Sequence, residues 1–236
     1  MNIFQSFMEG FEKTFIRDGR YKLFLEGLGN TLAITLFATL MGVVIGAVVA
    51  IIKVIYKQSN KRNPVLKVLN AIGELYTTVV RGTPVVVQLL IIYNIIFAAS
   101  DQAVLVGTIA FGINSGAYVS EIIRAGIMAV DIGQTEAGRS LGLSQSTTMF
   151  KIVLPQALKN VLPAIGNEFI SVLKETSVIG YLGVVDLTRA AERVITRTAD
   201  VYFPYLSIAV IYLVMVMGLN FLVKKLEKRL AKSDRS

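Results

Sequence analysis

Residues 28–52 read LGNTLAITLFATLMGVVIGAVVAII and carry no charged side chain. A helix needs about 20 mainly apolar residues to cross the hydrocarbon core of a bilayer, so this stretch predicts a membrane-spanning helix. Long apolar runs return at residues 104–130, 150–173 and 205–223. The chain of 236 residues is 54% hydrophobic, with a mean hydropathy of +0.63, well above that of an ordinary soluble domain. We therefore predict an all-α integral membrane protein that forms one transmembrane domain over residues 1–236.

The composition excludes several classes of function. The chain has no Cys, hence no disulfide framework and no thiolate site, and no His, which removes the commonest metal ligand and the usual general base. We expect no metal site and no catalytic residue. The net charge of +8 would suit a nucleic acid, but Lys and Arg also line the cytoplasmic edges of membrane helices. We adopt the second explanation and expect membrane lipid, not nucleic acid, as a partner.

The N-terminal segment, residues 1–27, differs from the rest of the chain. Four Phe residues recur at helical spacing and four charged residues lie on other faces, which predicts an amphipathic helix in the membrane interface. A helix packed against the bundle is the alternative. A cleavable signal peptide would instead show an uninterrupted apolar core and a small-residue cleavage site. The aromatic residues are Phe4, Phe7, Phe11 and Phe15, and the charged ones are Glu9, Glu12, Lys13 and Arg17.

Basic residues set the predicted orientation, because cytoplasmic segments of membrane proteins are rich in Lys and Arg. Residues 65–99 are half apolar before Gly82 and Pro84 and too short after them to cross comfortably, so we predict one broken crossing there. We then predict five transmembrane helices, N-terminus outside and C-terminus inside, in a helical core of residues 28–228. The cations that place two segments in the cytoplasm are Lys53, Lys57, Lys61, Arg62 and Lys67, and then Lys224, Lys225, Lys228, Arg229, Lys232 and Arg235.

A polar segment, residues 131–155, lies between two of the apolar runs. Thr135 is able to cap a short helix, and Glu136 would then lie in the first turn, where the helix dipole favours an anion. Gly142 suits the left-handed residue that ends a helix, and Ser144 is able to cap the next one. A short helix offered to a groove is a known mode of recognition, whereas the alternative is an ordinary connection between helices. The small residues that would let a partner surface come close are Ala137 and Gly138.

A second group of residues, Arg81-Gly82-Thr83-Pro84 followed by Gln88, lies at the predicted break. A broken helix at membrane depth frees amides and carbonyls that protein, water or solute must satisfy. The start of a half-helix also directs its positive end at anionic groups such as a carboxylate. Arg81 and Thr83 are candidates for that role. The alternative is a proline kink with Arg81 extended toward the lipid headgroups.

A third group ends the run at 150–173. Glu168 stands within an apolar stretch, where an acid is costly and usually faces a cavity or a partner. Glu175 follows seven residues later, close to the same helix face, and Lys174 lies beside it. Acid and base together would complement a zwitterion, and a spare acid would suit a cationic side chain. The alternative is an internal ion pair that holds the bundle together. Separately, a structural ion pair is expected between Glu121 and Arg124, three residues apart.

These segments resemble the permeases of ABC importers. Glu136-Ala137-Gly138, then Gly142 and, after nine residues, Ile152-Val153-Leu154-Pro155 resemble the EAA loop of that family, with Gly138 in place of its third Ala. The segments around Arg81 and Glu168 resemble those of its amino-acid permeases, and the likeness covers residues 21–228. It implies the type I ABC importer permease fold, with residues 131–155 as a cytoplasmic coupling loop. The implied ATPase-coupling residues are Glu136, Ala137, Gly138, Gly142, Ile152, Leu154 and Pro155, and the implied substrate-binding residues are Arg81, Thr83, Gln88, Glu168, Lys174 and Glu175.

The resemblance also implies the partners. It predicts a bacterial cytoplasmic-membrane importer for polar amino acids, with a second permease, identical or paralogous, and an external solute-binding protein. Glu168 and Glu175 extend the expected solutes to basic amino acids. The chain has no Gly-x-x-x-x-Gly-Lys-Ser/Thr motif, so no cofactor is expected on it and ATP-Mg would bind to separate ATPase subunits. Two alternatives stay open. One is a secondary transporter or channel driven by a gradient, and the other is the same fold serving a peptide or an oxyanion.

Overall fold

The computed structural model describes residues 3–58 and 63–232, and every regular element within them is a helix. The all-α prediction is therefore confirmed for this part of the chain. Three of the cations that set the predicted orientation, Lys61, Arg62 and Arg235, lie outside the described residues.

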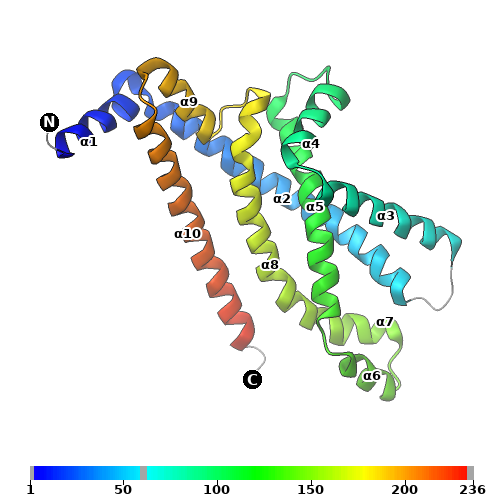
Figure 1. Ribbon diagram of the computed structural model, residues 1–236. Helices are drawn as coiled ribbons and strands as arrows, with labels where there is room; N and C mark the ends of the chain where they lie inside the picture. Colours follow the sequence, from blue (N-terminus) through cyan, green and yellow to red (C-terminus); the bar gives the residue numbers. More distant parts are fainter. Residues whose placement is uncertain (1–2, 59–62, 233–236) are drawn as a thin grey trace.

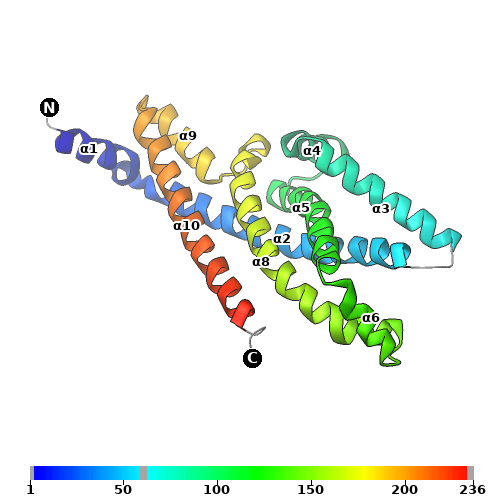
Figure 2. The ribbon, with the colours of Figure 1, turned by 60° about the horizontal axis from the view of Figure 1, so that its bottom comes forward.

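The longest helix, α2 (Tyr21–Gln58), extends past the predicted span at both ends and runs along the whole molecule. Two helices cross it, α5 (Ala103–Met128) and α8 (Leu154–Glu175) (Figures 1 and 2). The helix α9 (Leu187–Thr198) packs on its N-terminal part, and α3 (Pro64–Gly82) lies beside its C-terminal part. Because α2 touches all four helices, it is the element that fixes their relative positions.

The N-terminal helix α1 (Ile3–Phe11) continues through a π-turn (Glu12–Ile16) and a 3-10 turn (Arg17–Gly19) into α2. Part of the aromatic face of this segment packs on the bundle: the Phe7 ring meets that of Phe203 edge-on at 5.4 Å, and the Phe15 ring of the π-turn lies tilted against that of Phe24 at 4.8 Å. The ring of Phe4 is 71% exposed. The aromatic face thus serves both predicted purposes, contact with the bundle at some positions and an open apolar surface at others.

The predicted break in the second crossing is confirmed. The helix α3 ends at Gly82, and α4 (Val85–Ile91) and a π-turn (Ile92–Ile96) follow. The chain bends by 110° between α3 and the segment formed by α4 and the π-turn. Among the described residues, three helices are long and apolar enough to cross a membrane singly, α2, α5 and α10 (Tyr202–Lys232), and the bent pair qualifies as one more. The helix α8 carries more polar residues and does not qualify by this measure.

The segment after α5 lies at one end of the molecule. It forms α6 (Ile132–Ser140), a short α7 (Gln145–Thr148) and a π-turn (Met149–Val153) that runs into α8. After α8 a 3-10 stretch (Thr176–Leu182) leads to α9 and α10. Figure 1 shows α6 at the opposite end of the molecule from α9.

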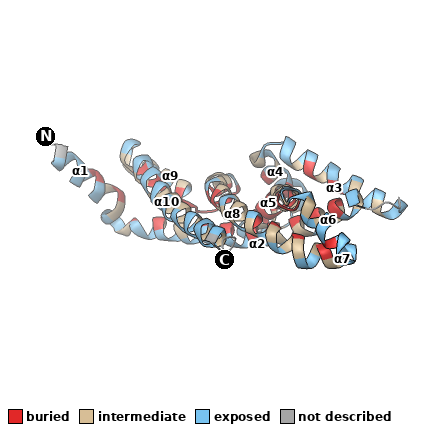
Figure 3. Ribbon diagram, turned by 90° about the horizontal axis from the view of Figure 1, so that it is seen from below, coloured by how far each residue is buried: buried red, intermediate tan, exposed pale blue. Residues whose placement is uncertain are grey.

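The buried residues gather where α2, α5 and α8 meet (Figure 3). Phe111 of α5 and Ile34 of α2, each 1% exposed, lie in this central core with Leu89 and Val172. The last helix, α10, packs only along one side, and just 11% of its most apolar stretch is buried. Its apolar surface is therefore available to lipid or to another subunit.

Candidate functional site

The predicted coupling segment begins at Asp131, whose carboxylate accepts a hydrogen bond of 2.6 Å from the Gly133 amide at the start of α6. The predicted cap at Thr135 is wrong, because Asp131 starts the helix earlier and leaves Thr135 inside it. Gly142 adopts the predicted left-handed conformation, with φ of +79°. Ser144 caps α7 as predicted, accepting a hydrogen bond of 3.1 Å from the third amide beyond it.

The helix α6 has one face toward solvent and one toward the rest of the chain. Glu136 and Ala137 are exposed, as a docking surface requires. Gly138 is buried instead: a Cβ there would lie 2.8 Å from Cγ2 of Thr148 and 3.0 Å from Cδ1 of Ile152. Gly138, which was predicted to admit a partner, therefore lets the π-turn approach α6. This contact packs α6 against the segment that leads into α8. Glu136 also lies in the middle of α6, not in its first turn.

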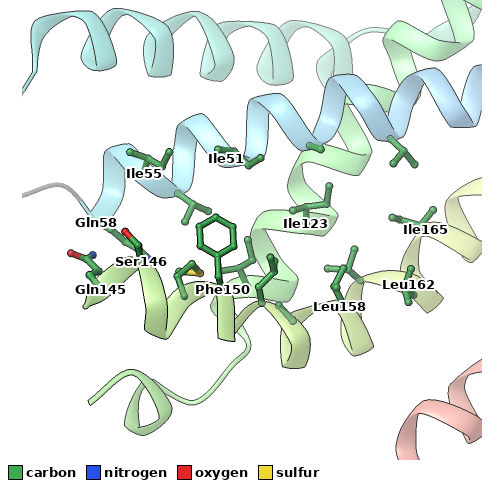
Figure 4. Close-up of a pocket in the computed structure, with 18 residues that line it drawn as sticks. Ile51, Ile55, Gln58, Ile123, Gln145, Ser146, Phe150, Leu158, Leu162 and Ile165 are labelled. Atoms are coloured by element: carbon green, nitrogen blue, oxygen red, sulfur yellow. The ribbon is translucent and has the colours of Figure 1, made fainter. Parts of the chain in front are cut away.

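The end of the motif joins this segment to the bundle. Leu154 and Pro155 are the first residues of α8, and Pro155, which has no amide hydrogen to donate, stands where the π-turn passes into the α-helix. Leu154 lines an apolar groove of about 740 Å³ between α2, α5, the π-turn and α8 (Figure 4). None of the six residues predicted to bind substrate lines it, and its polar lining residues are Gln58, Gln145 and Ser146. A zwitterionic solute would find few polar partners there.

At the break between α3 and α4, one amide side chain satisfies the freed backbone groups. Gln88 Nε2 lies 2.7 Å from the Val80 carbonyl oxygen, 3.0 Å from that of Thr83 and 2.7 Å from Thr83 Oγ1. Thr83 Oγ1 in turn donates to the Val79 carbonyl at 2.8 Å. Asn114 on α5 donates to Gln88 Oε1 at 3.0 Å. Thr83 and Gln88 thus have protein partners, and their main structural effect is to hold the break against α5.

A single turn of α5 anchors the surrounding helices. Besides Asn114, the Ile113 carbonyl accepts a hydrogen bond of 2.5 Å from the Tyr76 hydroxyl of α3. One turn further, the guanidinium of Arg81 lies 5.4 Å from the centre of the Tyr118 ring, a cation–π contact. Arg81 is nevertheless exposed, so its charge stays open to a further partner.

The same turn reaches α8. Ser115, fully buried, donates a hydrogen bond of 2.8 Å to Glu168 Oε1. Glu175 lies seven residues, about two turns, further along α8 and close to the same helix face. Neither acid forms an ion pair with any cation in residues 3–58 and 63–232, and Lys174 is exposed. The internal ion pair considered as the alternative for this site is absent from that part of the chain.

A second charged cluster, which the sequence analysis missed, joins α2, α3 and α5. Lys53 Nζ lies 2.8 Å from Glu121 Oε1, 2.8 Å from Thr77 Oγ1 and 3.3 Å from Glu74 Oε2. Its side chain is only 2% exposed, so it belongs to the bundle and not to the basic loop assigned from the sequence. Glu121 also binds Arg124 at 2.7 Å, which confirms the predicted pair. One sign in the sequence that Lys53 belongs to the bundle was the apolar pair Val54-Ile55 that follows it.

The fold and these sites together define a class of protein: a helical membrane protein with an exposed helix at one end and, within its bundle, two acids that form no ion pair in the described residues. Comparison with known sequences identifies the family. The chain belongs to the family described as the binding-protein-dependent transport system inner membrane component, whose profile matches residues 63–232. Membership places the chain in the inner membrane and excludes the gradient-driven transporter considered above.

Individual relatives agree with the family. The chain is 42% identical over 167 residues to a putative glutamine transport system permease of Rickettsia conorii, covering 70% of this chain and 77% of that one. It is 41% identical over 167 residues to an arginine transport system permease of Bacillus subtilis, covering 69% and 76%. The crystal structure of an amino acid ABC transporter with histidines superposes with a TM-score of 0.81 at 43% identity, over 89% of this chain and 94% of that chain.

Proposed function

We propose that this chain is the permease subunit of an ATP-driven importer for polar, and in particular basic, L-amino acids. The relatives named above as glutamine and arginine permeases support an amino-acid solute. The observation that carries the basic character is the pair of acids on α8. Neither Glu168 nor Glu175 forms an ion pair with a cation of the described chain, although acids within a membrane bundle usually face a partner or a cavity. A cationic solute would supply that charge.

Within this proposal the predicted pocket residues take different roles. Glu168, Glu175 and Lys174 contact the solute, the acids binding its ammonium or cationic side chain and the lysine its carboxylate. Arg81 offers a second positive group from α3. Thr83 and Gln88 position the broken helix, because their polar atoms already have protein partners.

The proposal also assigns the two ends of the molecule to the two sides of the membrane. The exposed face of α6, with Glu136 and Ala137, docks on a separate ATPase subunit in the cytoplasm, and ATP-Mg is bound there. The chain spans the membrane five times, with α8 as the fourth crossing, and a second permease completes the pathway. An external solute-binding protein delivers the amino acid. ATP binding would then draw the two coupling helices together and rock the bundles from inward- to outward-facing.

The test is uptake of labelled arginine by the complex reconstituted in vesicles, with unlabelled amino acids, peptides and anions as competitors. We expect arginine and lysine to compete best, and Glu168→Gln to weaken their competition more than that of glutamine. If Glu168→Gln only reduces the amount of folded protein and leaves the order of competitors unchanged, the acid has a structural role. Glu136→Lys should abolish ATP-driven uptake and copurification of the ATPase, while the chain still inserts. Unchanged uptake would refute the coupling role of α6.

A further inference from the structure

The helix α9 presents a row of arginines at the end of the molecule opposite α6 (Figure 1). Arg189, Arg193 and Arg197 follow one another at intervals of four residues, so they lie on one face, and all three are exposed. The row is about 12 Å long. We call this face of α9 the arginine ridge.

The ridge has a rigid support. The opposite face of α9 is in the core: Leu187 is 1% exposed, and Ala190, Ala191 and Val194 are fully buried. Asp186, also fully buried, caps the helix by accepting hydrogen bonds of 3.0 and 2.9 Å from the next free amides. The backbone of Asp186 rests directly on α2 at Gly27, where a Cβ would come within 2.5 Å. The arginines therefore project from a fixed helix, which lowers the entropy that a partner must remove on binding.

The charge of the ridge is mostly uncompensated. Arg189 binds Glu192 at 2.7 Å, but Arg193 and Arg197 form no ion pair with any residue that the structure describes. With α6 in the cytoplasm, α9 lies on the outer side, where Lys and Arg are disfavoured. All three cations of the ridge are arginines, whose planar guanidinium groups match carboxylates in two-point contacts.

We propose that the arginine ridge is a docking surface for an acidic surface of the external solute-binding protein. The inference rests on the proposed function, which puts α9 outside and requires such a protein to reach this side. An anionic membrane surface is the other source of acidic groups. It fits less well, because a helix that binds lipid turns its apolar face to the bilayer, whereas the apolar face of α9 is buried against α2 and α10.

The test uses the reconstituted complex and the arginine-loaded binding protein that supports ATP-driven uptake by the wild type. Uptake is measured against binding-protein concentration at several NaCl concentrations. The variants are Arg193→Glu and Arg193→Glu/Arg197→Glu. Lys22→Glu is the control matched to Arg193→Glu: it makes the same charge change as that single variant, at an exposed position at the start of α2, off the ridge. Vesicles of zwitterionic lipid and vesicles with anionic lipid are compared.

We expect the double variant to raise the half-saturating concentration of binding protein about tenfold, with Lys22→Glu close to wild type. Maximal uptake should be retained, and the rise of the wild-type value with salt should flatten in the double variant. Equal half-saturation in both variants and control would overturn the inference, as would a defect confined to vesicles with anionic lipid. Failure of the wild type to import with any binding protein would instead refute the proposed function.

Discussion

Replacing Lys53 by Met removes the cation at the centre of the buried cluster and keeps most of its apolar stem. The ammonium has three partners within 3.3 Å, on α3 and α5, and the side chain is 2% exposed. Removing one partner of a buried pair costs about 3 to 5 kcal/mol, because the remaining charge is left uncompensated. Here the lower value applies: Arg124 still binds Glu121, and the Glu74 side chain, 57% exposed, reaches water.

We therefore expect Lys53→Met to lower the free energy of unfolding by about 3 kcal/mol and the melting midpoint by about 6 to 12 °C. The chain has no Trp and no Cys, so neither indole fluorescence nor thiol dyes will report melting. The assay is size-exclusion chromatography of a fluorescent-protein fusion after heating in detergent.

A matched control lies one turn further along the same helix. Lys57 is exposed and forms no ion pair in the described residues, so Lys57→Met should change stability by less than about 0.5 kcal/mol. The loss in Lys53→Met/Glu121→Gln should be smaller than the sum of the losses in the two single variants, because the contact between Lys53 and Glu121 is removed in both. Equal melting of Lys53→Met and Lys57→Met would refute the view that the cluster holds α3 on the bundle.

Three further changes test other parts of the fold. Gly27→Ala places a Cβ 2.5 Å from the Asp186 carbonyl oxygen, so α2 and α9 must move apart. Melting should show a loss of about 1 to 3 kcal/mol, and wild-type stability would contradict this contact. Gln88→Leu strips the Val80 carbonyl of its partner and should cost about 1 to 3 kcal/mol in the same assay, unless the break between α3 and α4 is satisfied in another way. Gly142→Ala forces a side chain to φ +79°, at about 1 to 2 kcal/mol. Because Gly142 ends the coupling helix, ATPase copurification should fall, and full copurification would argue against that role.

Much of the fold could be predicted because its signals are local. Apolar length is a property of consecutive residues, so the span at 28–52 lies within α2 as expected. Gly82 and Pro84 act on the backbone at their own positions, and the bend between α3 and α4 follows. Gly142 and Ser144 took the predicted cap positions for the same reason. The pairing of Glu121 with Arg124 needed only their spacing on one helix.

One error was local, because Asp131 and not Thr135 starts α6, but the others concern residues whose surroundings come from other elements. Lys53 follows an apolar run, as a cation of a cytoplasmic loop would, and only the approach of α3 and α5 shows that it is buried. Gly138 was expected to face a partner, yet Thr148 at the end of α7 and Ile152 in the π-turn pack against it.

The amino-acid pattern was sufficient for the class of protein, the main helices and the polar segments, because each depends on neighbours within a few turns. Tertiary packing decided which polar groups remain unpaired. Gln88, Glu168 and Arg193 are polar residues of the same general kind in the sequence. Among the described residues, Gln88 is bonded at the break, Glu168 accepts a hydrogen bond from Ser115, and Arg193 on α9 forms no ion pair. Their difference arises because packed helices satisfy some polar atoms and leave others for solute or partner, and that sorting depends on contacts between residues far apart in the chain.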